Sequence, residues 1–350
     1  MNKKLRIILI VLAALVAAWI GLKKMTKIQK VQTYAMEEQD RLPVGRASIG
    51  VFEEYKVTGS TSRYDGLTLR GDDAVSEPSF MAWVDRRWSE IQKADAKQDA
   101  EHRPKMYRPS PHEVGFKFNA LDISDSSVPE WVYDGEGAVW LNNKAVFVAP
   151  GGAPNGDKKI TNIIDHTREM KSRDDKGYCL EFYCLDLPIS DSESARLNIQ
   201  IPKYGRLRVS VDVDTYTSSQ NEYFSQRTPS GGIRLSPQLL KTMDMGGSTY
   251  PNAEKRTVDG IVGEQDIFGR ADGINGHYET SIQARWYHPG TSKNPNDPSV
   301  EIALIYEFDT DHKPSKMGWF DDVTVKETGL TPEKFMSMWE ATLKSFKRQR

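Results

Sequence analysis

The segment of this chain that comes closest to a catalytic motif runs from Arg46 to Gly50. It has the serine and the second glycine of a G-x-S-x-G nucleophile elbow. Arg46 stands where the elbow needs a small residue to permit its strained turn, so Ser48 is a weak nucleophile candidate. The sequence has no phosphate-binding loop, no H-E-x-x-H motif and no paired-cysteine zinc motif. The sequence therefore predicts no catalytic residue. The alternative is an exported hydrolase whose active site does not match a known motif.

Metal-ligating side chains are present, but they lack the spacing of a metal site. The six histidines are His102, His112, His166, His277, His288 and His312. None stands three or four residues from another, so no pair falls on one face of a helix. Asp212 and Asp214 share one face of an expected strand and could hold a hard cation, but a solvated sheet face accounts for the same alternation. We expect no metal and no cofactor.

The two cysteines, Cys179 and Cys184, stand in the segment GYCLEFYCLDL, with no typical turn residue between them. In one extended strand, positions five apart point to opposite faces and lie about 16 Å apart. A disulfide needs Cα atoms within about 7 Å. We therefore expect two buried thiols and no disulfide, unless the strand bends between them.

Composition and charge describe a folded, acidic body. The 350 residues carry a formal net charge of −2. The first 30 residues hold seven basic and no acidic side chains, so residues 31–350 carry −9. An acidic body argues against nucleic acid as a partner and favours electrostatic steering toward a basic one.

The most hydrophobic segment of the chain is residues 7–22, which read IILIVLAALVAAWIGL between basic flanks. Sixteen helical residues cover about 24 Å, a little less than a hydrocarbon core of about 30 Å. Flanking lysine and arginine side chains can reach the headgroups. We expect residues 1–30 to be a transmembrane anchor with the body exported. A cleaved signal peptide or a merely hydrophobic tail would show a similar pattern.

Strands followed by a helix, twice and without strict alternation, predict an α+β fold. We expect two domains, residues 31–172 and 173–350, each a mainly antiparallel β-sheet with packed helices. The boundary is placed in the charged segment before Gly177.

Helix signals are clearest at two places. Ser76 precedes Glu77-Pro78 and an apolar stripe, which is typical of a capped helix. Thr331 precedes Pro332 in the same way and opens the last helix. Asn142-Asn143 predicts a hairpin turn, and residues 160–170 predict another helix. Strands are expected in the second half at 178–187, 195–202, 205–215, 255–268, 277–288 and 300–308.

The segment Lys255–Glu264 reads KRTVDGIVGE and places two glycines in an apolar strand. Glycine inside a strand marks a bulge or a close backbone approach, which we expect at Gly260 or Gly263. Arg256 and Glu264 are eight residues apart, so they share a face of a regular strand. They are too distant to pair directly. We expect them to form an ionic brace through a bend or with neighbouring strands, with direct partner contact as the alternative.

These motifs resemble a known family. The pattern Arg256-x-x-x-Gly260-x-x-Gly263-Glu264 is followed by Gln283-Ala284-Arg285-Trp286 and a proline-containing strand at 298–306. This order is similar to the C-terminal domain of immunity proteins that neutralise type VI secretion lipase effectors, specifically the fourth lipase class. The segment Gly177-Tyr178-Cys179 and the final helix from Phe335 to Arg348 resemble that domain too. The likeness covers about residues 173–350, whereas residues 31–172 are similar in layout only.

The resemblance implies a periplasmic two-domain clamp that grips the lid region of a phospholipase and has no catalytic residues. An anchor at residues 7–22 would hold the inhibitor at the inner membrane, which such a toxin attacks, and would raise its local concentration there. A structural or assembly component of the cell envelope is a further alternative.

Aromatic side chains on polar loops are the natural anchors of an inhibitory interface. The candidates for partner contact are Tyr223, Phe224, Trp319 and Phe320. Packing of these rings against their own domain is the alternative for each.

Overall fold

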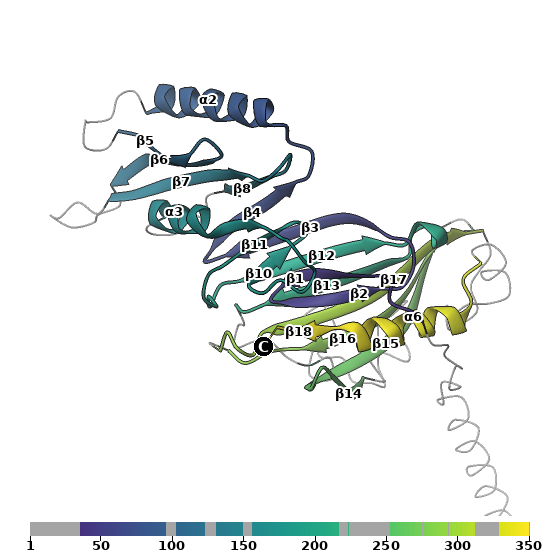
Figure 1. Ribbon diagram of the computed structural model, residues 1–350. Helices are drawn as coiled ribbons and strands as arrows, with labels where there is room; N and C mark the ends of the chain where they lie inside the picture. The colour runs from purple at the N-terminus through teal and green to yellow at the C-terminus, as the bar shows by residue number, and fades with distance from the viewer. Residues whose placement is uncertain are drawn as a thin grey trace, which may run out of the picture.

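The computed structural model of the chain describes residues 36–95, 103–122, 131–149, 156–216, 223, 253–274, 276–292, 294–311 and 329–349. They form two antiparallel β-sheets and three α-helices (Figure 1). The prediction of an α+β fold with mainly antiparallel sheets is confirmed. The expected anchor lies outside the described residues, and no helix within them is long and apolar enough to cross a membrane.

The larger sheet has 12 strands, and all of its neighbouring strands are antiparallel. In spatial order they are β14 (Glu254–Val258), β15 (Ile261–Ile274), β16 (His277–His288), β17 (Ser299–Thr310), β13 (Arg208–Asp214), β12 (Ser194–Gln200), β3 (Lys56–Tyr64), β4 (Leu67–Asp72), β8 (Ala145–Ala149), β7 (Trp131–Trp140), β6 (Glu113–Asp122) and β5 (Lys105–Ser110).

The smaller sheet has six short strands. In spatial order they are β18 (Lys347–Arg348), β2 (Ala47–Val51), β1 (Asp40–Gly45), β10 (Tyr178–Leu180), β11 (Tyr183–Leu185) and β9 (Thr167–Glu169). The helices are α2 (Glu77–Ala94), α3 (Gly156–His166) and α6 (Pro332–Ser345), with a 3-10 turn at Pro202–Tyr204.

Strand pairing crosses the domain boundary expected between residues 172 and 173. In the large sheet, β12 pairs with β3, and in the small sheet β10 pairs with β1. Both halves therefore contribute strands to both sheets. The division into two domains, residues 31–172 and 173–350, stays a prediction.

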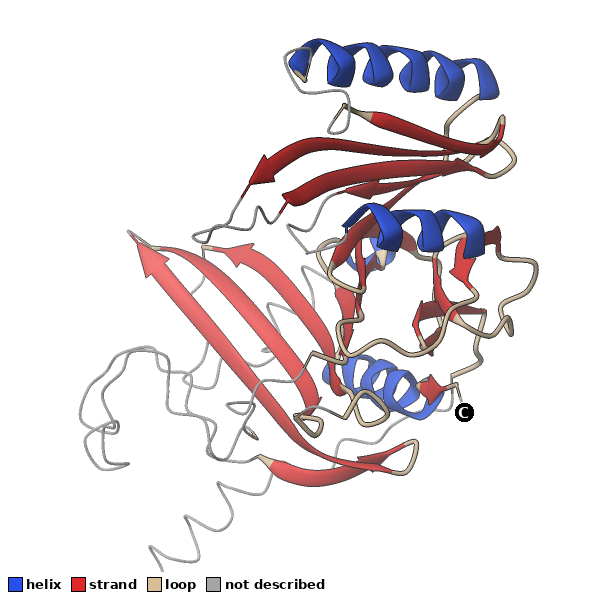
Figure 2. Cartoon of the chain, turned by 90° about the vertical axis from the view of Figure 1, so that its left-hand side faces the viewer, coloured by secondary structure: helices blue, strands red, loops and turns tan. Residues whose placement is uncertain are grey.

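The helices cover the sheets at different places (Figures 1 and 2). Helix α2 packs on one face of β5–β8, and α3 lies on the other face against β6 and β7. Helix α6 packs beside β2 and contributes fully buried Trp339 and Phe335 to the main core. Alternating apolar residues of β12 and β13, such as Leu197 and Val211, supply the facing layer of that core.

Local sequence signals account for several element ends. Ser76 caps α2 by accepting a hydrogen bond from the Ser79 amide, and Thr331 caps α6 by accepting one from Lys334. Asn142 and Asn143 both adopt positive φ between β7 and β8, as the hairpin prediction requires. These three predictions are confirmed.

The expectation of two free thiols is wrong, because Cys179 and Cys184 form a disulfide. The chain does not run as one strand through 178–187. It turns at Glu181 and Phe182, so β10 and β11 pair and place the cysteines directly opposite each other. Their Cα atoms are 4.1 Å apart. Glu181 takes a left-handed φ of 53° without the glycine or asparagine that usually marks such a turn.

Candidate protein-interaction site

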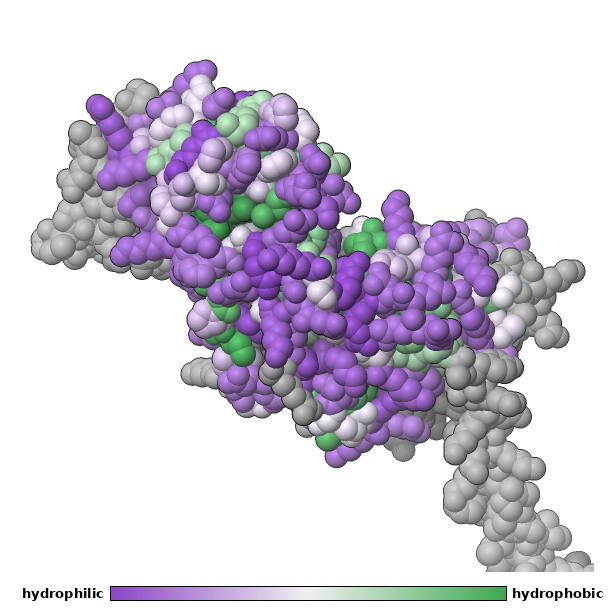
Figure 3. All heavy atoms as spheres, in the orientation of Figure 1, coloured by the Kyte–Doolittle hydropathy of each residue, from purple (hydrophilic) through white to green (hydrophobic). Residues whose placement is uncertain are grey.

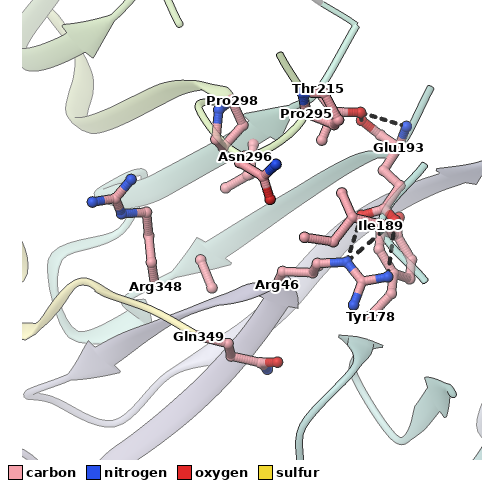
Figure 4. Close-up of a pocket in the computed structure, with 13 residues that line it drawn as sticks. Arg46, Tyr178, Ile189, Glu193, Thr215, Pro295, Asn296, Pro298, Arg348 and Gln349 are labelled. Atoms are coloured by element: carbon pink, nitrogen blue, oxygen red, sulfur yellow. Dashed lines mark hydrogen bonds and ion pairs between the residues drawn. The ribbon is translucent and has the colours of Figure 1, made fainter. Parts of the chain in front are cut away.

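Loops from both sheets converge on a cavity of about 300 Å³ (Figure 4). Six chain segments line it: the turn between β1 and β2, Tyr178 of β10, the segment 187–193 after β11, the end of β13, the loop 289–298 after β16, and the C-terminal residues 348–349. Rigid strands thus hold several loops at one place, which is the usual construction of a binding site.

Arg46 fixes the segment 187–193. Its Nε atom lies 2.9 Å from Oε2 of Glu193, whose side chain is only 4% exposed. Its Nη2 atom donates to the backbone oxygens of Leu187 at 2.7 Å and Pro188 at 2.9 Å. The Glu193 carboxylate also accepts the Ser190 amide at 2.7 Å. The two charges therefore neutralise each other, and the remaining hydrogen bonds of the pair go to the backbone of the loop, so the role of the pair is to hold the loop.

Thr215 joins the same loop to the end of β13. Its hydroxyl accepts the Glu193 amide at 2.8 Å and donates to the Ser190 oxygen at 2.9 Å. Between these fixed residues the loop presents Ile189, which is 43% exposed and lines the cavity. Tyr216 follows Thr215 and is 72% exposed.

An aspartate stands two positions along the chain from each of these two apolar residues. Asp191 is exposed and Asp214 is half-buried, and neither forms an ion pair within the described part of the chain. Burial raises the pKa of Asp214. Arg46 is paired with Glu193 and Arg196 with Asp212, whereas the positive charge of Arg63 acts on Asp214 and partly offsets the rise of its pKa. Exposed Asp191 is therefore the acid of this loop that has no ion pair among the described residues.

The face of the molecule that Figure 3 draws has no broad apolar area on its described residues. That face is mostly hydrophilic, and its hydrophobic residues form small separate areas. Such a surface binds a partner through a few anchoring side chains rather than through a broad apolar patch.

The motif residues of the second half lie together in one structural unit. Arg256 of β14 forms an ion pair with Glu340 of α6, with Nη2 and Oε2 2.6 Å apart. Its Nη1 atom also donates to Oε1 of Gln265 at 2.6 Å, and that oxygen accepts the Trp339 indole N–H at 2.9 Å. The expected brace exists, but its acidic partner comes from the last helix.

The two glycines of the motif have separate roles. Gly260 forms the turn between β14 and β15 with a φ of +79°, so the segment 255–268 is a hairpin and not one strand. Gly263 permits a close approach, because a Cβ atom there would lie 2.5 Å from the Trp286 ring. The Trp286 indole donates to the Arg256 oxygen at 3.0 Å. The prediction of a close backbone approach at a glycine is confirmed at Gly263.

The expectation that Arg256 and Glu264 share a face is wrong. The hairpin pairs Arg256 with Gly263 and Lys255 with Glu264, so the arginine and the glutamate point to opposite faces of the sheet. Glu264 is buried, with its own contacts on the other face.

Of the four aromatic candidates, the structure describes Tyr223. Its hydroxyl donates to the Val262 oxygen at 3.4 Å. Burial is the main cause that raises the pKa of Tyr223, and the negative charge of Glu264 raises it further. The ring therefore has a contact within its own chain. Phe224, Trp319 and Phe320 lie outside the described residues, and their contact role stays a prediction.

The weak catalytic and metal candidates have structural contacts. Ser48 lies within β2, not in a strand-to-helix turn, and its hydroxyl accepts a hydrogen bond from Arg41 at 3.1 Å. Asp212 accepts one from Arg196 at 2.8 Å. In the described ranges no three metal-ligating side chains come together.

Sequence reasoning missed Ile189, Tyr216 and the lock between Arg46 and Glu193. A local signal existed for the first: Ile189 is one apolar residue between Pro188 and a run of serine and aspartate. Nothing local marks the lock, because its partners are 147 residues apart.

Comparison with known proteins gives similarity in fold. No protein-family model matches the chain, and no curated protein does. The apo immunity protein TplEi of the type VI secretion system (T6SS) from Pseudomonas aeruginosa is 14% identical, with a TM-score of 0.59 over 88% of this chain and 96% of that chain. TplEi complexed with an "L" peptide is 13% identical, with a TM-score of 0.58 over 90% and 100%.

A chain in the crystal structure of the Tle4–Tli4 complex is 13% identical, with a TM-score of 0.61 over 90% of this chain and 99% of that one. At such identities the shared property is the fold, and it extends well beyond residues 173–350. This chain therefore has the fold of type VI secretion immunity proteins, as its C-terminal motifs implied.

Proposed function

We propose that this chain is a non-enzymatic immunity protein that binds a cognate phospholipase effector of the T6SS and inhibits it. The observation that carries the proposal is the shared fold, which spans 88% to 90% of this chain and nearly the whole of each similar chain. Those structures are of an immunity protein alone, of the same protein with a peptide, and of the Tle4–Tli4 complex. Binding to another protein, rather than turnover, is the activity that this fold supports best.

Inhibition by a clamp on the lid region of the lipase is the mechanism that we propose. The long sheet supports it, because one end carries α2 and α3 while α6 lies at the other end, beside β14 and β15, and the small sheet packs against the middle strands β12 and β13 (Figure 1). A partner held between two such parts would lose the freedom to open at a membrane.

We place the inhibitor in the periplasm, tethered to the inner membrane through residues 7–22. The disulfide between Cys179 and Cys184 supports an oxidising compartment, since cytosolic thiols are kept reduced. The basic, apolar and basic order of the first 30 residues supports the tether.

Co-purification with a candidate T6SS lipase effector from the same organism tests the proposal. The full-length chain and the tagged lipase would be expressed together, and the complex assayed on phospholipid vesicles. We expect a one-to-one complex without lipase activity, and an unrelated lipase, as the control, to stay active. A cognate lipase that keeps its activity with excess chain present would contradict the proposal.

A further inference from the structure

We propose that the cavity beside Ile189 receives an extended segment of the effector that carries a large apolar side chain next to a lysine or arginine. This inference rests on the proposed function and names the contact surface that the function needs. It involves none of the four aromatic residues selected from the sequence.

The first argument is the placement of exposed apolar side chains. Within the described residues, the large hydrophobic side chains that stay exposed are Tyr107, Ile189, Tyr216 and Val262. Single exposed apolar residues are ordinary. Ile189 and Tyr216, however, stand on adjoining loops, because the residues next to them, Ser190 and Thr215, share a hydrogen bond.

The second argument is the shape of the site. Ile189 faces the cavity from one side, and Pro295 and Pro298 line it from the loop after β16 (Figure 4). A volume of about 300 Å³ is at the lower limit for small-ligand pockets, which span about 300–1,000 Å³. Such a space suits one or two large side chains of a partner, the kind of anchor that dominates protein interfaces.

The third argument is that both walls are already ordered. Arg46, Glu193 and Thr215 hold the loop that carries Ile189. Asp297 holds the opposite loop, since its carboxylate accepts the Thr291 hydroxyl at 2.6 Å and lies 3.0 Å from Nε2 of His288. A preformed site loses little conformational entropy on binding, so its contacts contribute more fully to affinity.

The fourth argument is charge, which selects the occupant. Exposed Asp191 has no ion pair within the described residues, and Arg46 and Arg196 are already paired with Glu193 and Asp212. Asp214 accepts the Tyr216 amide at 2.7 Å and lies within the electrostatic reach of Arg63. The body as a whole carries −9. A basic residue beside the apolar anchor would pair with Asp191, and the acidic body would repel an anionic ligand.

Affinity measurements on full-length variants test the site. The informative substitutions are Ile189→Asp, Ile189→Ser, Tyr216→Ala and Asp191→Lys. Their matched controls are Tyr107→Ala, an exposed tyrosine on the distant edge strand β5, and Asp85→Lys on the outer face of α2. Thermal unfolding of each variant checks that it is folded, and Ile189→Ser preserves the test if Ile189→Asp does not fold.

We expect Ile189→Asp to weaken binding of the lipase by at least about 30-fold and Tyr216→Ala by about 5- to 30-fold, as hot-spot residues do. Asp191→Lys should slow association by about 5- to 10-fold, an effect that disappears in high salt. The controls should stay within about twofold. If the site variants bind like the controls while the native chain binds and inhibits, the inference is wrong and the proposed function stands. If the native chain does not bind the lipase, the proposed function itself is wrong, and the site inference that rests on it is wrong too.

Cross-linking identifies the occupant. A photoreactive amino acid at position 189, irradiated in the native complex, should attach to a lipase segment with a large apolar residue within two positions of a lysine or arginine. Attachment to a second copy of this chain, or to a segment without a basic residue, would overturn the proposed chemistry. Protection of residues 187–193 from hydrogen exchange in the complex would support it.

Discussion

Arg256 of β14 holds Glu340 of α6 through two parallel hydrogen bonds, with Nη1 2.8 Å from Oε1 and Nη2 2.6 Å from Oε2. The two residues are 84 positions apart, and the pair joins the edge of the large sheet to the last helix. Both side chains are less than one-third exposed, so solvent screens the pair less than an ordinary surface ion pair.

Removal of this pair should destabilise the protein. We expect a double-mutant cycle with Arg256→Ala and Glu340→Gln to give a coupling free energy of about 1–2 kcal/mol in chemical denaturation. The more exposed pair of Arg196 and Asp212 is the control, with an expected coupling below about 1 kcal/mol. Equal couplings for the two pairs would show that burial does not strengthen the first.

The same pair should make stability depend on acid. The hydrogen bonds from Arg256 lower the pKa of Glu340 below its ordinary value of 4.5. Its stabilisation is therefore complete above about pH 4.5 and is lost as the pH falls through the lower, folded-state pKa. The difference in unfolding free energy between the native protein and Glu340→Gln should shrink between pH 6 and about pH 3. A constant difference would exclude this linkage.

Asp266 should have the opposite effect. Its side chain is buried, its Oδ2 atom has no hydrogen-bond partner within the described structure, and burial raises its pKa to about 6. Because the folded-state pKa lies above the ordinary one, stability should fall as the pH rises from about 4 to 6. We expect Asp266→Asn to be more stable than the native protein by about 1–3 kcal/mol at pH 7 and similar to it at pH 4. A variant less stable at pH 7 would show that the charge is compensated.

The disulfide should contribute to stability although it closes a short loop. The chain-entropy model gives about 2 kcal/mol for a loop of this length. We expect the double variant Cys179→Ala with Cys184→Ala to unfold at lower denaturant concentration than the oxidised protein. Its midpoint should not respond to a reductant, whereas the native midpoint should move toward that of the variant. An oxidised native protein no more stable than the variant would contradict the expectation.

The two motif glycines offer a matched pair of substitutions. Gly263→Ala places a methyl group against the Trp286 ring and should cost about 2–3 kcal/mol by overpacking. Gly260→Ala meets nothing within 4 Å and should cost about 1 kcal/mol from its positive φ alone. Thermal unfolding separates the two. The reverse order would mean that the Trp286 contact adapts easily.

The sequence was most informative where the signal is local. The caps at Ser76 and Thr331 and the turn at Asn142 each depend on residues a few positions apart, and each appears where expected. The helix expected over 160–170 ends at His166, because Thr167 pairs with Leu185 in the small sheet. That pairing is not visible in helical periodicity.

The candidate site was the least predictable part. It is assembled from loops far apart in sequence, and its walls depend on pairs such as Arg46 with Glu193. The Cys179 disulfide was missed for a similar reason. Its hairpin turns at Glu181 and Phe182, which do not favour such a turn by composition, so tertiary contacts must impose it.

The ladder between β12 and β3 has a practical consequence for anyone who wishes to cut this protein in two. A fragment of residues 31–172 would lose β10 as the partner of β1, β11 as the partner of β9 and β12 as the partner of β3, and each fragment would expose unpaired strand edges. Such edges invite aggregation. Truncation phenotypes at this boundary would therefore report insolubility rather than the activity of a half, and paired fragments expressed together are the sounder genetic tool.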